Sequence, residues 1–293
     1  MNNTSLKLRK KAPNHIIEIL RLVFNTTSEL NIPAFVVGAT ARDLIFEYVY
    51  EADILRATED IDFGIAVGNW TDYEKIKKSL IDTKKFKDDG KNEQRIWWIG
   101  EKESMKIDLV PYGGLESPQG KIAFPPDGGF QMSTLGFAEA FENSILLEIT
   151  EDLTVNVVSL PGLALLKFIA YNDRPHERRR DIQDIWFIAK NYMKVEAEER
   201  LFDENASDGD LLLDEVFDYE TCGARLLGRD IARLLNEDTR TILTRIMAEE
   251  KDGGRLEAFA DVIQSDGLYD DDRYKNILKI LRELRRGITE RSA

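Results

Sequence analysis

The chain has 293 residues, of which 43% are hydrophobic and 32% charged, and it is long enough for one large domain or two ordinary ones. Its formal net charge of -14 argues against broad, sequence-independent binding to nucleic acids, which depends on phosphate neutralisation by Lys and Arg, although it leaves room for a local basic groove. The single cysteine excludes an internal disulfide and a cysteine-rich zinc site, and two histidines argue against a histidine-built metal site, so any metal is expected to have oxygen ligands and to be Mg²⁺ or Mn²⁺.

Helical and strand patterns alternate over about the first 158 residues. Helices are indicated by apolar residues three and four apart, and strands by short apolar runs or strict alternation. This pattern predicts a mixed sheet with helices over residues 1–158. The predicted elements are, in chain order, helix 13–30, strand 34–37, helix 40–55, strand 60–67, helix 71–81, and strands 95–99, 105–111, 145–149 and 155–158.

From Ser159 onward the periodicity is helical throughout, with helices expected over 159–171, over 176–192 and at several places between 216 and 286. We therefore expect an α+β protein, in which the mixed sheet domain of residues 1–158 is followed by an all-helical domain of residues 159–293. Between Glu196 and Glu220 there are eleven acidic residues and one basic residue. The part of this stretch over 196–215 is expected to be a linker or a long solvated loop.

Two aspartates lie one residue apart in the predicted strand 60–67. Because side chains in a strand alternate between its two sides, Asp60 and Asp62 share one face, where their other neighbours are small. Two adjacent carboxylates repel each other, and a divalent metal ion would remove that cost. The alternative is a solvated strand end with two surface acids. The opposite face is apolar and consists of Ile61, Phe63, Ile65 and Val67.

A third acid, Asp108, occupies the polar face of the predicted strand 105–111. If this strand is the neighbour of strand 60–67, three carboxylates converge on one side of the sheet. Such an arrangement suits two divalent ions about 4 Å apart, which together hold the attacking and leaving oxygens of a phosphoryl displacement. Taken alone, Asp108 would be interpreted as an ordinary acid at the edge of a strand, and only together with Asp60 and Asp62 does it indicate a metal site.

A strand ends at Gly38, and a helix is expected to begin within two residues. Helix N-termini offer free N–H groups and a positive dipole end, which hold phosphates well. The sequence also fits a capping box, with Thr40 as the N-cap and Asp43 reaching back to it. Arg42 is expected either to meet a phosphate or to pair with a nearby acid such as Asp60.

Lys167 lies in an apolar run of the first predicted helix of the second domain. A buried ammonium group needs an anion or it loses its charge. Its partner is either a phosphate or an acid from the next helix, where Asp181 and Asp184 flank the apolar stripe. The second possibility is an internal Lys–Asp bridge without chemistry.

These motifs, taken in order, resemble the nucleotidyltransferase superfamily of the polymerase-beta type. Within it the chain most resembles the AbiEii/AbiGii-type toxins, which are the nucleotidyltransferase half of type IV toxin–antitoxin pairs. The stretch from Gly38 to Asp43 is also similar to CCA-adding and poly(A) polymerases. The resemblance extends over roughly residues 30–192. It is based on Gly38 to Asp43, Asp60-Ile-Asp62, Ile107 to Gly113, Leu160 to Lys167, and Arg179 to Ile185.

The resemblance implies a metal-dependent enzyme that moves a nucleoside monophosphate from an NTP to an acceptor. It implies that Asp60 and Asp62 hold the metal ions and that Asp108, as a third catalytic and metal-binding acid, helps to activate the attacking hydroxyl. Gly38 and Thr40, with Arg42, would bind the triphosphate. From the helical domain, Lys167 would contact it, and Asp184, in preference to Asp181, would be the last motif acid.

Some toxins of this kind modify tRNA acceptor ends, so the resemblance implies tRNA as an acceptor and an antitoxin protein as a partner. Two alternatives to an enzyme stay open: a non-catalytic protein on the same fold that senses nucleotides or binds a partner, and a purely structural α/β protein. No apolar run reaches the length of a membrane span, and the basic N-terminal residues are not followed by the apolar segment of a signal peptide. We therefore expect a cytoplasmic location and no membrane partner.

Overall fold

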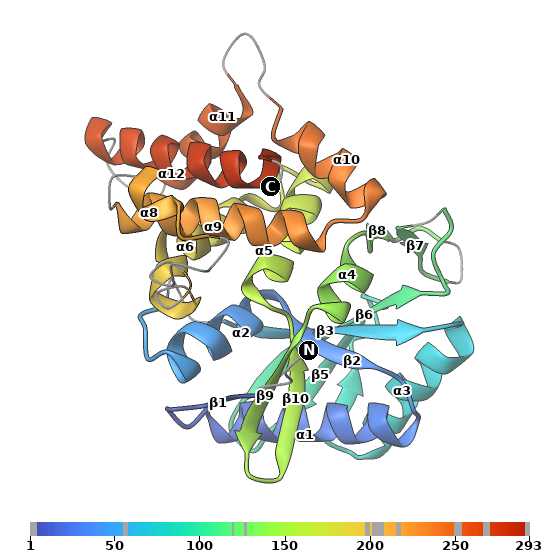
Figure 1. The fold of residues 1–293 in the computed structure, drawn as a ribbon. Coiled ribbons are helices and arrows are strands. Elements are labelled where there is room, and N and C mark those ends of the chain that lie inside the picture. The colour runs from blue at the N-terminus through green and yellow to red at the C-terminus, as the bar shows by residue number, and fades with distance from the viewer. Residues whose placement is uncertain are drawn as a thin grey trace. The chain divides into compact units, whose positions relative to one another are not determined.

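The computed structural model describes residues 5–54, 58–118, 120–125, 128–196, 200, 208–214, 218–248, 254–265 and 270–290. The chain divides into two compact units, Met1–Ser159 and Leu160–Ala293. The first unit contains a mixed sheet with helices, and the described elements of the second are all helices (Figure 1). The predicted fold class is therefore confirmed.

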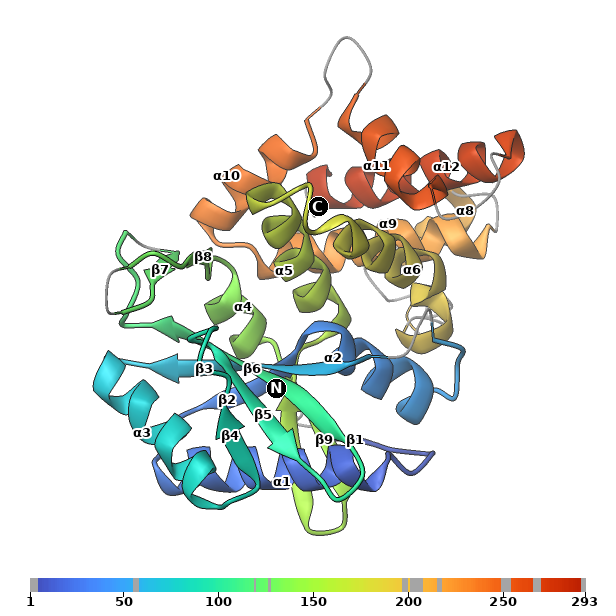
Figure 2. The same ribbon diagram turned by 180° about the vertical axis from the view of Figure 1, so that it is seen from behind.

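The main sheet of the first unit has eight strands among the described residues, in the order β1-β9-β10-β2-β3-β6-β5-β4. The central strand β3 runs antiparallel to β2 and parallel to β6, and β6 is followed by β5 and β4 toward one edge of the sheet (Figure 2). A small second sheet pairs β7 with β8. The strands are β1 Leu6–Lys7, β2 Ala34–Val37, β3 Asp60–Val67, β4 Phe86–Asp88, β5 Arg95–Ile99, β6 Ser104–Gly113, β7 Lys121–Ala123, β8 Gln131–Ser133, β9 Ile145–Thr150 and β10 Leu153–Val157.

One face of the main sheet is apolar, and helices α1 and α3 pack on it. Phe63 of β3 meets Phe24 of α1 edge to face, and the hydroxyl of Tyr73 on α3 donates to the carbonyl of Leu109 on β6 at 3.0 Å. The four apolar residues predicted for one side of β3 are all buried. The helices of this unit are α1 Asn14–Glu29, α2 Gly38–Asp43, the π-helix η1 Leu44–Val49, α3 Trp70–Asp82 and α4 Phe137–Glu142.

The opposite face of the sheet carries Asp60 and Asp62, and we call it the carboxylate face. Beyond these residues along β3, helix α4 packs on this face through a cluster of aromatic rings. In this cluster Phe35 of β2 and Tyr112 of β6 each contact the ring of Phe137. At Gly64, opposite Phe35 in the ladder, a Cβ atom would lie only 2.2 Å from the ring of Phe35. The aromatic cluster therefore leaves the Asp60 end of the carboxylate face uncovered by α4.

The helix predicted over 40–55 differs from the structure at both ends. It begins at Gly38 as α2, continues as the π-helix η1 and ends at Val49, while residues 55–57 lie outside the described part of the chain. The sequence pattern also missed β1, β4, the β7–β8 pair and α4, which are short and span too few residues for a periodicity to show.

In the second unit, α9 and α12 approach each other at glycines. A Cβ atom on Gly228 would lie 2.3 Å from the carbonyl oxygen of Leu284, and one on Gly287 would lie 2.0 Å from the carbonyl oxygen of Arg225. The two backbones are therefore in direct contact. The described helices are α5 Leu160–Asp173, α6 Arg179–Glu196, α8 Leu211–Asp214, α9 Tyr219–Leu234, α10 Glu237–Ile246, α11 Arg255–Gln264 and α12 Asp271–Thr289. Not one of the helices described in either unit is long and apolar enough to cross a membrane.

The acidic stretch predicted as a linker or solvated loop is ion-paired, and at Asp208 buried, where the structure describes it. The side chain of Asp208 is only 3% exposed and pairs with Arg200 at 2.7 Å and with Arg229 at 3.2 Å. Asp210 pairs with Arg229 at 2.9 Å. Although burial works to raise the pKa of Asp208, these arginines and Arg233 hold it below its ordinary value. Residues 208–214 are thus fixed to α9 by ion pairs; residues 197–199, 201–207 and 215 of the stretch lie outside the described residues.

Candidate active site

The structure places the three predicted carboxylates on neighbouring strands and on one face of the sheet. In the parallel pair of β3 and β6, Asp62 lies directly opposite Asp108, and Asp60 lies opposite Lys106. Adjacent strands are about 4.8 Å apart, so Asp62 and Asp108 are immediate neighbours. All three side chains are partly buried. The two strands that carry the aspartates are therefore neighbours in the sheet, as the sequence analysis required.

Gly38 lies against this group of acids at the end of β2. Its φ angle is +69°, a conformation that L side chains rarely adopt, and a Cβ atom there would lie 1.9 Å from Oδ2 of Asp62. Val37, the residue before it, is opposite Asp62 in the antiparallel pair of β2 and β3. The turn therefore needs glycine both for its backbone conformation and for its contact with the Asp62 carboxylate.

The capping box predicted at the start of α2 is wrong. The helix begins two residues before Thr40, so Thr40 lies inside it, and no side chain caps its N-terminus. The Thr40 hydroxyl instead donates to the carbonyl of Asp60 at 2.8 Å and ties α2 to the first residue of β3. Asp43 accepts from the Thr58 hydroxyl at 2.5 Å and from the guanidinium of Arg42.

Arg42 has an internal partner and does not face solvent. Its side chain is fully buried, and its Nε and Nη2 atoms donate to Oδ1 of Asp43 at 2.8 and 2.6 Å. The sequence left open whether Arg42 meets a phosphate or pairs with an acid such as Asp60. In the described part of the chain, Arg42 pairs with an acid, and this acid is Asp43. A fully buried guanidinium cannot reach a nucleotide without local opening, so the structure does not support the predicted role of Arg42 in nucleotide binding.

Sequence reasoning missed Arg95, which lies opposite Asp108 in the antiparallel pair of β5 and β6. Its Nε and Nη2 atoms donate to Oδ1 and Oδ2 of Asp108, both at 2.7 Å, and the two side chains are 22% and 14% exposed. This is the bidentate geometry in which Arg and carboxylate bind most strongly. A signal was present, since Arg95 opens a predicted strand that is joined to the Asp108 strand by a short turn. The register of the two strands was needed to use it.

The surroundings of Asp60 disfavour its ionised form. Burial, and next to it the charge of Asp108, raise the pKa of Asp60 above its ordinary value, while Lys106 and Arg95 work in the opposite direction. A raised pKa means that the ionised carboxylate lacks full compensation from its surroundings. The acids of this face are therefore arranged so that additional positive charge would be favourable.

The arrangement fits a divalent cation in part. In the described part of the chain, no group of three or more His, Cys, Asp or Glu side chains is gathered so that it could hold a metal ion. The predicted site of three carboxylates around a shared cation is thus not met, because both oxygens of Asp108 are bound to Arg95. Asp60 and Asp62 remain as two hard oxygen donors on one strand face, a donor type that suits Mg²⁺ or Mn²⁺.

In the helical unit, Lys167 is buried and lies between two carboxylates. Its Nζ atom is 2.8 Å from Oδ1 of Asp181 and 2.8 Å from Oδ2 of Asp184. Although burial works to lower the pKa of Lys167, the two carboxylates hold it above its ordinary value. The internal Lys–Asp bridge left open by the sequence is therefore present, and Asp184 is fully buried within it. That Lys167 and Asp184 contact a nucleotide stays a prediction.

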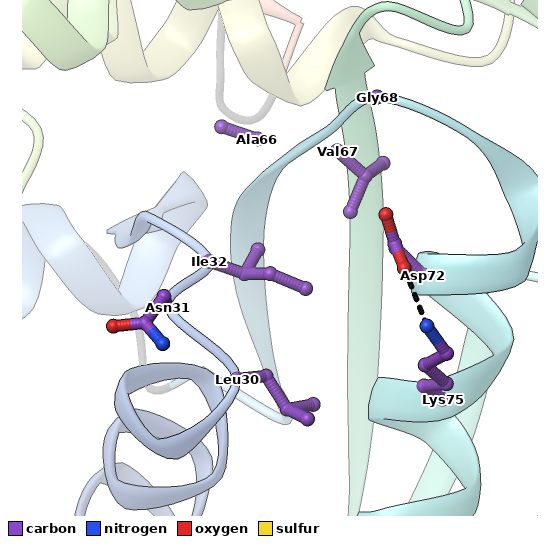
Figure 3. A pocket seen from close by; sticks show the side chains of 8 residues that line it. All are labelled: Leu30, Asn31, Ile32, Ala66, Val67, Gly68, Asp72 and Lys75. Carbon is purple, nitrogen blue, oxygen red and sulfur yellow. Dashed lines mark hydrogen bonds and ion pairs between the residues drawn. The ribbon is translucent and has the colours of Figure 1, made fainter.

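A hollow of about 280 Å³ lies elsewhere in the first unit, at the other end of β3 (Figure 3). Because Ala66 and Val67 border it, it is separated from Asp60 by roughly 20 Å along the strand. An ion pair of 2.9 Å between Lys75 and Asp72 closes one side. The hollow is thus distinct from the group of acids. Its lining consists of Leu30, Asn31, Ile32, Ala66, Val67, Gly68, Asp72 and Lys75.

Comparison with solved structures finds distant similarities. The antigenic nucleotidyltransferase-like protein from Paracoccidioides brasiliensis is 16% identical, with a TM-score of 0.42 and coverage of 61% of this chain and 77% of that one. JHP933 from Helicobacter pylori is 13% identical, with a TM-score of 0.41 and coverage of 95% and 94%. The Thermotoga maritima CCA-adding enzyme, complexed with tRNA, is 16% identical, with a TM-score of 0.33 and coverage of 92% and 66%. Among curated protein sequences none matches the chain.

A match to a family model identifies the family of the chain, which similarity to these distant structures does not. It describes the nucleotidyl transferase AbiEii toxin of type IV toxin–antitoxin systems, and it matches residues 21–265. The matched range contains the Gly38 turn, the aspartates of β3 and β6, and the Lys167 bridge. It also accounts for most of the 293 residues. The chain therefore belongs to the AbiEii family of nucleotidyl transferases, which are NTP-using enzymes.

Proposed function

We propose that this nucleotidyltransferase moves a nucleoside monophosphate from an NTP to a hydroxyl group at the acceptor end of a tRNA. One observation carries the proposal: Asp62 and Asp108 are directly opposite each other on adjacent parallel strands, on the face that Asp60 shares and beside the Gly38 turn. Carboxylates on one face of a sheet are the type of oxygen donor that phosphoryl transfer with divalent ions uses.

In the proposed reaction, the acceptor hydroxyl oxygen forms a bond to the α-phosphorus of the NTP. The bond between the α-phosphorus and the bridging oxygen to the β-phosphate breaks, and pyrophosphate leaves with the electron pair of that bond. The hydroxyl proton passes to the carboxylate of Asp108, which must first exchange its bonds to Arg95. Positioning and charge stabilisation then account for most of the rate enhancement.

Asp60 and Asp62 are proposed to hold the divalent ion, Mg²⁺ or Mn²⁺. When bound there, such an ion would supply charge neutralisation for the phosphate oxygens of the NTP. The raised pKa of Asp60 supports this assignment, because its carboxylate lacks full compensation in the protein alone. Asp108 is proposed to join this set only after it has left Arg95.

The nucleotide is proposed to bind at the Gly38 turn. The backbone at Gly38 comes close to the Asp62 carboxylate, and Thr40 connects the same turn to β3 through the Asp60 carbonyl, so both residues fix the turn beside the acids. For Lys167 and Asp184 the assignment follows the family resemblance alone. Membership of a toxin–antitoxin family supports two further proposals, a cognate antitoxin as protein partner and action in the cytoplasm.

A transfer assay tests the proposal. The protein is incubated with Mg²⁺, each labelled NTP in turn and total tRNA, and label transfer and pyrophosphate release are measured for the wild type and for Asp62→Ala. The wild type is expected to label tRNA, and the variant to lose transfer while its unfolding curve keeps a single cooperative transition for the first unit. Full transfer by folded Asp62→Ala contradicts the role of the carboxylates. Pyrophosphate release without labelled tRNA contradicts the acceptor.

A further inference from the structure

The carboxylate face continues beyond the acids, across β6 and β5 to the edge strand β4. In the strand registers, Asp60 is opposite Lys106, Lys106 is opposite Trp97, and Trp97 is opposite Lys87. Directly opposite residues of neighbouring strands share a face, so these four side chains form one row. The row starts at a candidate metal-binding acid and ends, about 14 Å away, at the edge of the sheet.

Trp97, in the middle of this row, is held in a fixed orientation. Its Nε1 atom donates to Oδ1 of Asp89 at 2.6 Å, and this hydrogen bond is the main reason why the pKa of Asp89 falls to about 2. Nζ of Lys106 lies 5.9 Å from the centre of the indole ring. The ring is nevertheless only partly buried, whereas Trp98, its neighbour on the other face, is 3% exposed. Trp97 is thus an ordered and accessible aromatic ring beside the acids.

The row is also locally basic in a strongly acidic chain. Lys87 is exposed and Lys106 is half-buried, and neither forms an ion pair with a carboxylate among the residues that the structure describes. Of the acids near the two lysines, Asp89 accepts from Trp97 and Asp108 accepts from Arg95, while Asp60 lies opposite Lys106 at the inner end of the row. With 54 acidic and 40 basic residues in the whole chain, two lysines opposite one accessible aromatic ring, with no ion pair of either among the described residues, are a specific local feature.

We propose that Lys87, Trp97 and Lys106 form the platform that binds the acceptor RNA strand next to its reactive end. The inference rests on the proposed function, because it places the terminal hydroxyl at Asp108 and the preceding nucleotide over Trp97. An aromatic ring flanked by positive charges is the arrangement that binds single-stranded nucleic acid: the ring stacks on a base and the ammonium groups neutralise the phosphates. A protein or small-molecule acceptor has no repeated phosphates to match both lysines.

Equilibrium binding of a fluorescently labelled single-stranded RNA to the full chain, without NTP, tests the platform. Trp97→Ala is expected to weaken binding roughly 5- to 150-fold, the range for loss of one stacked base, while Trp97→Phe keeps a ring and retains most of the affinity. Lys87→Ala and Lys106→Ala should each reduce the slope of log affinity against log salt concentration by about 0.7. The matched control is Lys78→Ala on α3, which packs on the opposite face of the sheet.

The binding results distinguish failure of the proposed RNA platform from failure of the proposed transfer reaction. RNA binding by the wild type that is unchanged in Trp97→Ala and in both lysine variants, or a wild type that binds no RNA, overturns the platform. Equal losses in Lys78→Ala and Lys87→Ala also overturn it, because the effect would then be one of overall charge. Label transfer from NTP to total tRNA, measured in parallel on the same variants, shows whether the proposed transfer survives such a result. If Trp97→Ala does not fold, the RNA affinities of Trp97→Phe and of the two lysine variants still test the platform.

Discussion

Replacing Gly38 by alanine introduces one methyl group at the contact between the turn and the candidate metal-binding acids. Two costs follow from the structure. Alanine at a φ of +69° is strained by about 1–2 kcal/mol. In addition, the new Cβ atom would lie 1.9 Å from Oδ2 of Asp62, far inside van der Waals contact, so either the turn or the carboxylate must move.

Gly90 provides a matched control for the first of these costs. Its φ angle is +72°, close to that of Gly38, but a Cβ atom there would meet no heavy atom within 4 Å. Gly90→Ala should therefore lose about 1–2 kcal/mol of stability from backbone strain alone. The difference between the two variants isolates the displacement of Asp62.

The assay combines urea unfolding with nucleotide transfer at saturating NTP and Mg²⁺. Both variants are expected to have lower unfolding midpoints than the wild type, and Gly38→Ala the lower of the two. Transfer by Gly90→Ala should stay near the wild-type rate, while Gly38→Ala should fall by at least about a hundredfold, since a displacement of about 1 Å in a catalytic group can cost that much. Wild-type transfer by a folded Gly38→Ala would refute the claim that Asp62 acts from the position that the structure shows.

Three further perturbations follow from the ion pairs. Arg95→Gln leaves the Asp108 carboxylate without its partner, so the free energy of unfolding measured in urea should fall by about 1–3 kcal/mol. Mg²⁺ should restore part of this loss in the variant. An equal effect of Mg²⁺ on the stability of wild type and variant would contradict the prediction. Lys167→Met leaves two buried carboxylates side by side and should cost about 3–5 kcal/mol at pH 7, and a loss below 1 kcal/mol would show that the bridge matters little. Asp208→Asn should cost about 1–3 kcal/mol at neutral pH, a value reduced for the partly exposed arginines. Because the pKa of Asp208 is lowered on folding, its contribution is present above pH 3.8 and is lost as the pH falls through the folded value, so unfolding curves of Asp208→Asn and wild type should converge in acid.

The strand pattern around the aspartates was predictable because its physics is local. Alternation of apolar and acidic residues over 60–67 assigns each side chain to a face, and the same rule places Asp108 on the polar face of its strand. The bond between Arg95 and Asp108 was not predictable in this way. It depends on which residues of β5 and β6 are opposite each other, and two strands joined by a turn can pair in several registers.

Two errors in the sequence analysis show how a local rule can be overridden. Thr40 and Asp43 have the spacing of a capping box, but a glycine with positive φ starts the helix two residues earlier, and both side chains take other partners. The acidic segment was expected to be solvated because like charges usually are. Its described acids are instead paired with Arg225, Arg229 and Arg233, which recur four residues apart on one side of α9, and this spacing is visible in the sequence.

The missed arginine and the predicted metal site answer the same electrostatic requirement. Three carboxylates on one sheet face repel one another, so a stable fold needs positive charge among them. Sequence reasoning assigned this charge to metal ions shared by all three acids, whereas the structure assigns part of it to Arg95, which binds only Asp108. Arg95 does not satisfy Asp60 in the same way, because burial and the charge of Asp108 still raise the pKa of Asp60 above its ordinary value. Stabilisation by Mg²⁺ should therefore depend on Asp60 and Asp62 in the wild type and on Asp108 only once Arg95 has been removed.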